Sequence, residues 1–413
     1  MVTERMADAR SVTLGVWVGT GSRDEEPSRA GASHFLEHLL FKGTPSWTAG
    51  EIAEAVDEVG GDMDAFTTKE YTAFTIRLLS EDLPLGLDVL SAIMTDPAFR
   101  PGDVDAERQV ILDEILMHSD EPADLVGERY MEGLFPGHPL GREVLGEPGV
   151  ISSIGPDEIR EFFDHHYRAA NLVVAAAGQV EHELLAREVA SRFAGRSGGS
   201  RPTRTPPGPT IDPLVVTTRA TEQAHIVLGM RTPGRHDERR FALGVLNHAL
   251  GGGISSRLFQ EVRERRGLAY AVWSERSSYD EVGSLSVSVG TAPENAQEVL
   301  RLVVKELDRL GEDGLTRREL EVAKGHWRAE TILALEDPGS RMARIGSSML
   351  LHSEVVEVEE LLERVMSVSL EEVGTLAAEL AAAPRVLSVV GPFEPGDFED
   401  MEYSAVRAAG ARG

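Results

Sequence analysis

Apolar and polar residues alternate along the chain in a pattern that predicts two similar sets of strands and helices. In the first half, residues 12–18 form an apolar run of strand length. Further on, Phe74, Ile76 and Leu78 alternate with polar neighbours, which is the period of two expected of a half-buried strand. Residues 226–230 form a comparable apolar run in the second half. The chain therefore contains a diverged internal repeat.

The order of the later elements supports this repeat. The matching segments are residues 34–43 and 244–253 for a first helix, 65–79 and 268–289 for a pair of strands, and 103–118 and 316–335 for a long helix. Asp103 follows Pro101 and Gly102 and is expected to cap the first long helix. Paired strands mixed with several helices predict an α+β protein with two homologous domains, each a mostly antiparallel sheet flanked by helices.

A stretch rich in Gly, Ser and Pro lies near the middle of the chain. It reads GRSGGSRP from residue 195 and PPGP from residue 206. This composition predicts an extended linker that has no core of its own. We therefore expect an N-terminal domain at residues 1–194, a linker at 195–212 and a C-terminal domain at 213–413.

The first helical pattern carries three ionisable residues on one side. At 100° per residue, His34, Glu37 and His38 fall within an arc of about 100°, and apolar residues cover most of the remaining circumference. A helix that is apolar nearly all round is a buried helix. Buried ionisable groups are costly unless they are paired or bind a metal. The spacing of four residues lets both imidazoles reach one point, as zinc coordination requires.

A catalytic zinc needs a third protein ligand and one open position. Glu107 and Glu114 lie two helical turns apart beside the apolar stripe of the predicted helix 103–118. Glu114 as a ligand, with Glu107 as the partner of a ligand histidine, would explain two carboxylates on a core-facing side. The chain has no cysteine, so a thiolate zinc site is excluded.

Other interpretations of the histidines stay open. A histidine pair on a helix is more often packed or solvated than bound to a metal, and the two carboxylates shift the balance towards metal. His118 lies one turn from Glu114 and is a possible competing ligand. His165 and His166 point about 100° apart on a helix, so they cannot hold one ion together.

The composition restricts the classes of partner. The 413 residues carry a formal net charge of −28, which argues against nucleic-acid binding because that function requires a basic surface. The acidity fits either a chamber that attracts cationic peptides or a solvated surface. No segment has the length and apolarity of a signal peptide or a membrane span, so we expect a cytoplasmic protein without membrane contact.

The order His-x-x-Glu-His at residues 34–38, with Glu114 placed 76 residues after His38, resembles the pitrilysin or inverzincin family of zinc metallopeptidases. Within that family the chain looks most like the mitochondrial processing peptidases and their bacterial relatives. The resemblance implies that His34, His38 and Glu114 bind zinc. It also implies that Glu37 is the general base on the attacking water and that Glu107 is a supporting carboxylate.

The resemblance extends to other parts of the chain. Arg263 and Tyr270 match a substrate-contacting pair of the family, and the segment Ala65, Phe66, Thr67 and Thr68 resembles its peptide-binding edge strand. Asp64 stands where the family usually has Asn. Met1 falls inside the usual first strand of the family, so we expect either that N-terminal sequence is missing or that the start of the protein is shifted.

The second half departs from the zinc motif. Gly244, Asn247 and His248 occupy the positions that correspond to His34, Glu37 and His38. We therefore expect one zinc ion per chain.

The resemblance implies a zinc-dependent endopeptidase that cleaves extended peptides inside a closed chamber. Because one chain carries both the zinc motif and the Arg263–Tyr270 pair, we expect a homodimer, whereas related heterodimers divide these features between subunits. One alternative is a non-catalytic scaffold subunit of a heteromeric complex, although such subunits typically lose motif residues. A second alternative is a zinc hydrolase that acts on a substrate other than a peptide.

Overall fold

The structure is a computed structural model that describes residues 1–401 and 403. It consists of two compact units, each assembled from three segments of the chain. Unit 1 contains residues 1–116, 142–205 and 331–356, and unit 2 contains the described remainder. Each unit therefore includes a segment from the opposite half of the chain. Residues 195–205 of the predicted linker belong to unit 1, and residues 206–212 belong to unit 2.

Unit 1 is built on a five-stranded sheet with the order β1-β5-β2-β4-β3. Its strands are β1 (Val2–Arg5), β2 (Ser11–Val18), β3 (Asp62–Thr67), β4 (Thr72–Leu79) and β5 (Leu172–Gly178). Only β1 and β5 are parallel, and the other neighbours are antiparallel. Strand β3 lies at one edge of this sheet.

Helices cover this sheet on both faces. They are α1 (Ala32–Leu40), α2 (Ala49–Glu58), α3 (Leu83–Thr95), α4 (Pro101–Asp120, which continues into unit 2), α6 (Pro148–Ser153), α7 (Pro156–His166), α8 (His182–Arg192) and α12 (Pro338–His352). Single-turn 3₁₀ helices lie at Ser22–Asp24, Pro27–Arg29, Ser80–Asp82, Ala169–Asn171 and Ala194–Arg196.

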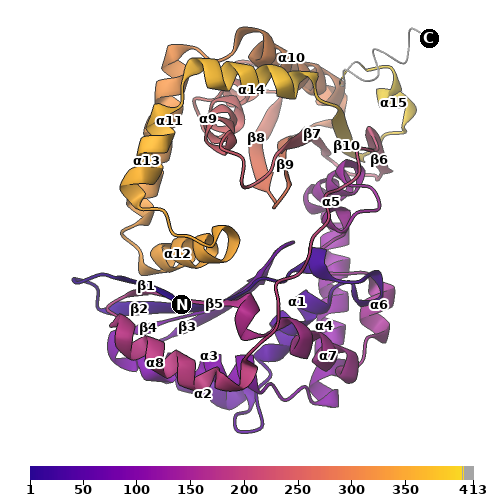
Figure 1. Cartoon of the computed structure of the whole chain (residues 1–413). Coiled ribbons are helices and arrows are strands. Elements are labelled where there is room, and N and C mark those ends of the chain that lie inside the picture. Colours follow the sequence, from indigo (N-terminus) through magenta and orange to yellow (C-terminus); the bar gives the residue numbers. More distant parts are fainter. Residues whose placement is uncertain (402, 404–413) are drawn as a thin grey trace. The chain divides into compact units, whose positions relative to one another are not determined.

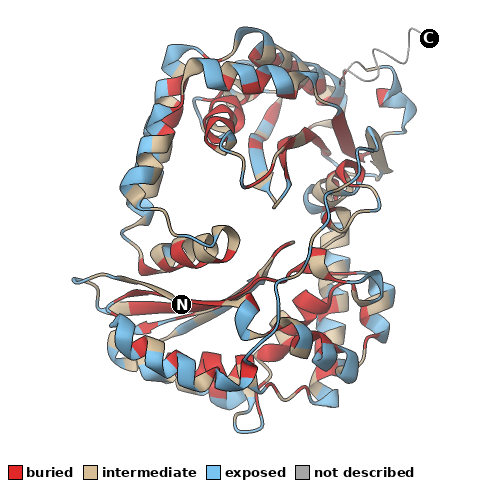
Figure 2. Cartoon of the chain, viewed as in Figure 1, coloured by how far each residue is buried: buried red, intermediate tan, exposed pale blue. Residues whose placement is uncertain are grey.

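Strand β2 shows how the alternation of residues produces the two faces. Val12, Leu14 and Val16 point into the larger core, which α1 and α3 share. Trp17 points the opposite way, into a smaller core that contains Met342 of α12. Because the sheet has a helix layer on either side, β2 is buried along nearly its whole length, and it appears red in Figure 2. Helix α12 is also held by Arg344, whose guanidinium lies 3.0 Å from a Glu4 carboxylate oxygen of β1.

Unit 2 repeats this arrangement around a sheet with the order β6-β10-β7-β9-β8. Its strands are β6 (Leu214–Thr218), β7 (Ala224–Pro233), β8 (Ala269–Ser278), β9 (Val282–Thr291) and β10 (Arg385–Gly391). Again one neighbouring pair, β6 and β10, is parallel and the rest are antiparallel. The predicted class, α+β with two homologous domains, is confirmed by the matching strand orders.

The helices of unit 2 also lie on both faces of its sheet. They are α5 (Pro122–Leu134), α9 (Arg240–Gly251), α10 (Ala296–Asp313), α11 (Arg317–Ala334, which continues into unit 1), α13 (Val358–Ser367), α14 (Leu370–Ala382) and α15 (Gly396–Glu399). Short helical turns lie at Pro139–Gly141, Phe259–Glu264 and Pro293–Asn295. Figure 1 shows α5 beside β10, where Tyr130 joins a core with Val386. Helix α5, from the first half of the chain, thus covers one face of the unit 2 sheet, as α12 covers one face of the unit 1 sheet.

Two predicted details of the helices are wrong. Helix α4 starts at Pro101 instead of behind it, because proline is well suited to a first helical position, where its missing N–H is not needed. The Arg100 carbonyl accepts the first helical bonds, from Asp103 and Val104. Asp103 is therefore inside the helix and is not its cap. Helix α1 ends at Leu40 and not at residue 43, since Gly43 has a φ of +105° that a helix does not allow.

The first part of the predicted linker is fastened to unit 1. The Arg204 guanidinium donates to the Asp24 carboxylate at 2.8 and 2.9 Å and to the Glu70 carbonyl at 2.6 Å. The buried Arg196 donates to the Tyr167 carbonyl at 2.8 Å. Residues 195–205 thus contribute buried contacts, and the expectation of a linker without a core does not hold for them.

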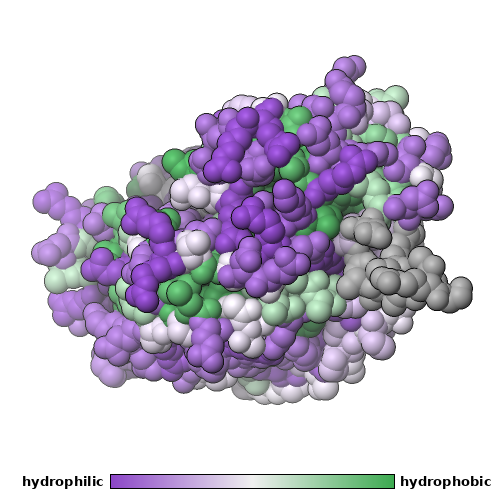
Figure 3. All heavy atoms as spheres, turned by 90° about the horizontal axis from the view of Figure 1, so that it is seen from above, coloured by the Kyte–Doolittle hydropathy of each residue, from purple (hydrophilic) through white to green (hydrophobic). Residues whose placement is uncertain are grey.

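The surface and the helices agree with the polar composition. Hydrophilic residues predominate on the face shown in Figure 3, and hydrophobic ones gather there in separate patches. In the part of the chain that the structure describes, no helix combines the length and apolarity needed to cross a bilayer. The cytoplasmic location stays a prediction.

Two helical glycines test the packing of α12. A Cβ atom on Gly346 would lie 2.3 Å from the indole nitrogen of Trp17, whereas one on Gly325 of α11 would meet no atom within 4 Å. We expect Gly346→Ala to lower the free energy of unfolding by about 1–3 kcal/mol through overpacking. The control, Gly325→Ala, should raise it by about 0.5–1 kcal/mol because alanine favours a helix. Urea unfolding measures both, and a Gly346→Ala protein as stable as wild type would contradict the close packing.

Candidate metal centre

Helix α1 is fixed at its first turn by a buried carboxylate. Its N-cap, Gly31, has a φ of +95°, a conformation that favours glycine. The two Glu25 oxygens accept the N–H groups of Gly31 and Ser33, each at 2.7 Å. These bonds satisfy donors that a helix start leaves without partners, and the carboxylate lies at the positive end of the helix dipole. Burial raises the pKa of Glu25 to about 7, although the two N–H groups oppose this shift.

The motif residues converge as predicted. The Nε2 atoms of His34 and His38 each lie 3.6 Å from the same Glu114 carboxylate oxygen, and one ligand atom from each residue lies within 4.8 Å of the other two. Tetrahedral zinc with bonds of about 2.0–2.1 Å places its ligand atoms roughly 3.3 Å apart, so the three residues fit this ion. Among the residues that the structure describes, this is the one cluster of its kind.

Glu107 supports the second histidine from behind. One of its oxygens lies 3.0 Å from Nδ1 of His38, and the other lies 2.5 Å from the Lys42 ammonium group. A proton on Nδ1 bonded to Glu107 leaves the lone pair of Nε2 for a metal. Glu107 is buried, and Lys42 compensates its charge.

Lys42 is a residue that the sequence analysis missed. Its spacing of four residues from His38 was a usable signal, although α1 has already ended before it. Glu25 was missed as well. No local pattern identifies it, because it reaches α1 from a separate turn.

Glu37 lies beside the three potential metal ligands and accepts a hydrogen bond from the edge strand β3. It is half-buried, and the Thr67 hydroxyl donates to its Oε2 at 2.6 Å. Burial raises the pKa of Glu37, while the bond from Thr67 and the nearby His38 lower it. A carboxylate shielded in this way can exchange a proton with a nearby water.

Strand β3 places part of the predicted substrate segment next to this base. Ala65 packs with the core behind α1, and Phe66 stands on the other face against Trp17 and Tyr71, at ring distances of 5.9 Å. Thr67 ends the strand, and Thr68 follows it. The strand has an open edge in the sheet order, and its role in binding a peptide stays a prediction.

Arg263 and Tyr270 are brought together within unit 2. Arg263 lies in the short helical turn Phe259–Glu264, and its guanidinium carbon lies 4.8 Å from the centre of the Tyr270 ring. Tyr270 is 81% exposed. A cation and an open aromatic face suit contact with a peptide, and the role of the pair towards a substrate stays a prediction.

The corresponding region of unit 2 is filled by an aromatic side chain. A Cβ atom on Gly244 would lie 2.3 Å from the Trp327 ring, so the absence of a side chain there makes room for the indole. His248 stacks on His326 with ring centres 4.1 Å apart. In this repeat, packed aromatic rings take the place of the potential metal ligands of unit 1.

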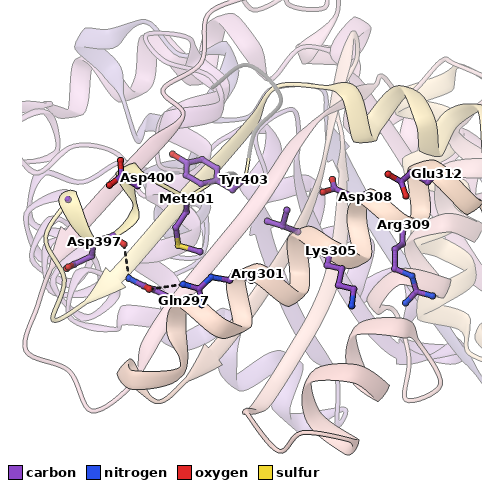
Figure 4. Close-up of a pocket in the computed structure, with 12 residues that line it drawn as sticks. Gln297, Arg301, Lys305, Asp308, Arg309, Glu312, Asp397, Asp400, Met401 and Tyr403 are labelled. Atoms are coloured by element: carbon purple, nitrogen blue, oxygen red, sulfur yellow. Dashed lines mark hydrogen bonds between the residues drawn. The ribbon is translucent and has the colours of Figure 1, made fainter. Parts of the chain in front are cut away.

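A cavity of about 970 Å³ lies elsewhere, in unit 2. Its wall comes from α10 and from the segment that starts at Gly396, and Gln297 bridges Arg301 and the Asp397 carbonyl across it (Figure 4). His34, His38 and Glu114 do not line this cavity. This cavity is therefore separate from the candidate metal site.

Comparison with known proteins decides the family. Residues 1–148 match the family described as Insulinase (Peptidase family M16), and residues 153–325 match the Peptidase M16 inactive domain. An uncharacterized zinc protease of Streptomyces coelicolor is 44% identical over 402 residues, covering 95% of this chain and 88% of that protein. The chain belongs to peptidase family M16. The resemblance noted in the sequence is thereby confirmed.

Other M16 relatives agree. An uncharacterized zinc protease of Mycobacterium tuberculosis is 42% identical (95% of this chain, 91% of the relative), and one of Bacillus subtilis is 36% identical (95% and 96%). The crystal structure of a peptidase M16 inactive domain from Pseudomonas fluorescens superimposes with a TM-score of 0.89 at 20% identity, covering 95% of both chains. A protease from Helicobacter pylori gives 0.86 at 21% identity, covering 93% of this chain and 95% of that one. At these identities the structures support the fold alone.

The contact between Glu107 and His38 predicts a loss of metal affinity. We expect Glu107→Gln to weaken zinc binding by about 10- to 100-fold, because an amide holds the imidazole less firmly than a carboxylate. Competition with a chromophoric chelator measures the affinity. Asp113→Asn, an exposed position on the same helix, is the control and should bind zinc like wild type. Equal affinities for all three proteins would refute the supporting role of Glu107.

Proposed function

We propose that this M16 protein is a zinc-dependent endopeptidase that cleaves extended peptides. The observation that carries the proposal is the position of Glu37. It lies on the helix that presents His34 and His38, and it is bonded to the open-edged strand β3. Three residues that could hold a metal, a neighbouring carboxylate and a strand edge thus lie together in unit 1. The names of the relatives, zinc proteases, support the same activity.

The residues divide the work as follows. His34, His38 and Glu114 would hold the zinc ion, one per chain, which would polarise the scissile carbonyl and make water more acidic. Glu37 takes a proton from the attacking water and returns it to the leaving amine. Glu107 keeps His38 in the required tautomer. The edge of β3, from Ala65 to Thr68, aligns the peptide by adding it as a further strand.

The alternative interpretations are less well supported. A scaffold subunit has no need of the five intact motif residues, and the contact between Glu107 and His38 supports a role for His38 in coordination. A zinc hydrolase of another kind gives no role to the open edge of β3. Peptide cleavage uses every part of the site.

The activity is tested on an unbiased peptide mixture by mass spectrometry. We expect wild-type protein loaded with zinc to cut internal bonds and Glu37→Gln to lower the rate by about 10²–10⁴-fold, because only the proton transfer is lost. Glu37→Gln should still bind zinc, and a chelator should stop the wild-type reaction. Cleavage that survives both the substitution and the chelator would defeat the proposal.

We also propose that two chains form a homodimer around a closed chamber and that each active site draws on both chains. One chain supplies the zinc residues and the other supplies Arg263 and Tyr270. The support is that this chain carries both features, with Arg263 and Tyr270 already in contact.

Mixing inactive variants tests the shared site. Glu37→Gln and Arg263→Ala chains should each be inactive alone and should regain about a quarter of wild-type activity when they are refolded together in equal amounts. This fraction follows from random pairing, in which half of the dimers contain one intact site of two. Mixtures that stay inactive would show that no site is completed across chains.

A further inference from the structure

The hydroxyl group of Thr67 makes a direct contact with the residue assigned as the base. Its Oγ1 donates to Oε2 of Glu37 at 2.6 Å, a short bond of the kind formed to a charged acceptor. We propose that Thr67 is a positioning residue, which holds the Glu37 carboxylate in place for proton transfer through its side chain. This inference rests on the proposed function, because it assigns a second role to a residue of the peptide-binding strand.

The backbone around Thr67 is held firmly. Thr67 pairs with Thr72 in the register of β3 and β4. The next residue, Thr68, donates both its N–H and its hydroxyl to the Tyr71 carbonyl, at 2.8 and 2.9 Å, and it accepts the Ser22 N–H at 3.1 Å. These bonds close the hairpin immediately after Thr67. The hydroxyl group that reaches Glu37 thus starts from a fixed point.

Glu37 is the partner that needs support. Its side chain has three rotatable bonds and is only half-buried, so packing alone leaves it several positions. Fixing Oε2 leaves Oε1 as the oxygen that accepts the proton. A general base must lie within hydrogen-bond reach of its water, and a displacement of about 1 Å is enough to cost roughly 100-fold in rate.

The side chain and the backbone of Thr67 then act on different steps. The backbone belongs to the edge that receives the peptide, and the side chain holds the base that acts on it. Removing the hydroxyl group leaves the backbone edge intact. A change confined to kcat, with little effect on KM, therefore distinguishes the positioning role from a role in binding the peptide.

Three variants of the zinc-loaded, full-length protein test this inference. Thr67→Val has nearly the same shape without the hydroxyl group, and Thr67→Ser keeps it. Thr75→Val is the matched control, because it removes a hydroxyl group from the neighbouring strand that donates to the Asp64 carbonyl and not to Glu37. All are assayed on one peptide that the wild type cleaves.

We expect Thr67→Val to lower kcat by about 10- to 100-fold with KM changed by less than about twofold, as a displaced base implies. Thr67→Ser should restore most of kcat, and Thr75→Val should match the wild type. A Thr67→Val kcat within about twofold of wild type, or a loss expressed in KM alone, overturns the inference.

A measurement without activity tests the same contact. In metal-free protein, the infrared difference spectrum between the wild type and the Glu37→Gln variant isolates the carboxylate stretch of Glu37. Repeating it in the Thr67→Val background should shift this band, because the carboxylate loses a hydrogen-bond donor. An unshifted band overturns the inference.

The experiments also distinguish a disturbed fold from a failure of the proposed function. Thr67→Ala, which is smaller, replaces Thr67→Val if circular dichroism shows that valine disturbs the fold, and the same expectations apply. If the wild type cleaves no peptide, the proposed function fails, and the infrared comparison still decides whether Thr67 holds Glu37.

Discussion

The burial of a polar stripe on helix α1 governs the organisation of unit 1. His34 is 5% exposed, and the helix around it is packed on nearly every side. Ionisable groups in such a place are stable only when each has a partner. Helix α4 provides Glu107 and Glu114 as partners of the histidines, and strand β3 provides Thr67 as the partner of Glu37. The turn before the helix places Glu25 at its first N–H groups. The elements around α1 are thus placed where its polar groups need them.

The two repeats show the same requirement met in two ways. Both use the same order of strands. In the second, Gly244 removes a side chain and Trp327 fills the space against it. A sheet with a helix behind it can therefore bury either a set of coordinating groups or an indole ring. Which one it buries depends on a few residues and not on the fold.

Much of this could be predicted from the sequence, because the signals are local. The spacing of His34 and His38 depends only on the geometry of one helix, and the alternation in residues 72–79 depends only on one strand. Glu114 could be placed because a second apolar stripe pointed to a buried side. The start of α4 was wrong because Pro101 signals a first helical position as well as a break. Lys42 and Glu25 were missed because their partners lie in other elements.

No local sequence pattern predicts that α12 packs on the sheet of unit 1. This arrangement affects how the chain folds during its synthesis. The face of the first sheet that contains Trp17 is covered by residues synthesised long after its last strand, β5. At ordinary rates of translation, roughly 10–30 s pass between the synthesis of β5 and the synthesis of α12. During this time the nascent chain presents an apolar sheet face without its helix. Apolar surface left uncovered in this way makes a nascent chain prone to aggregation until α12 has been made.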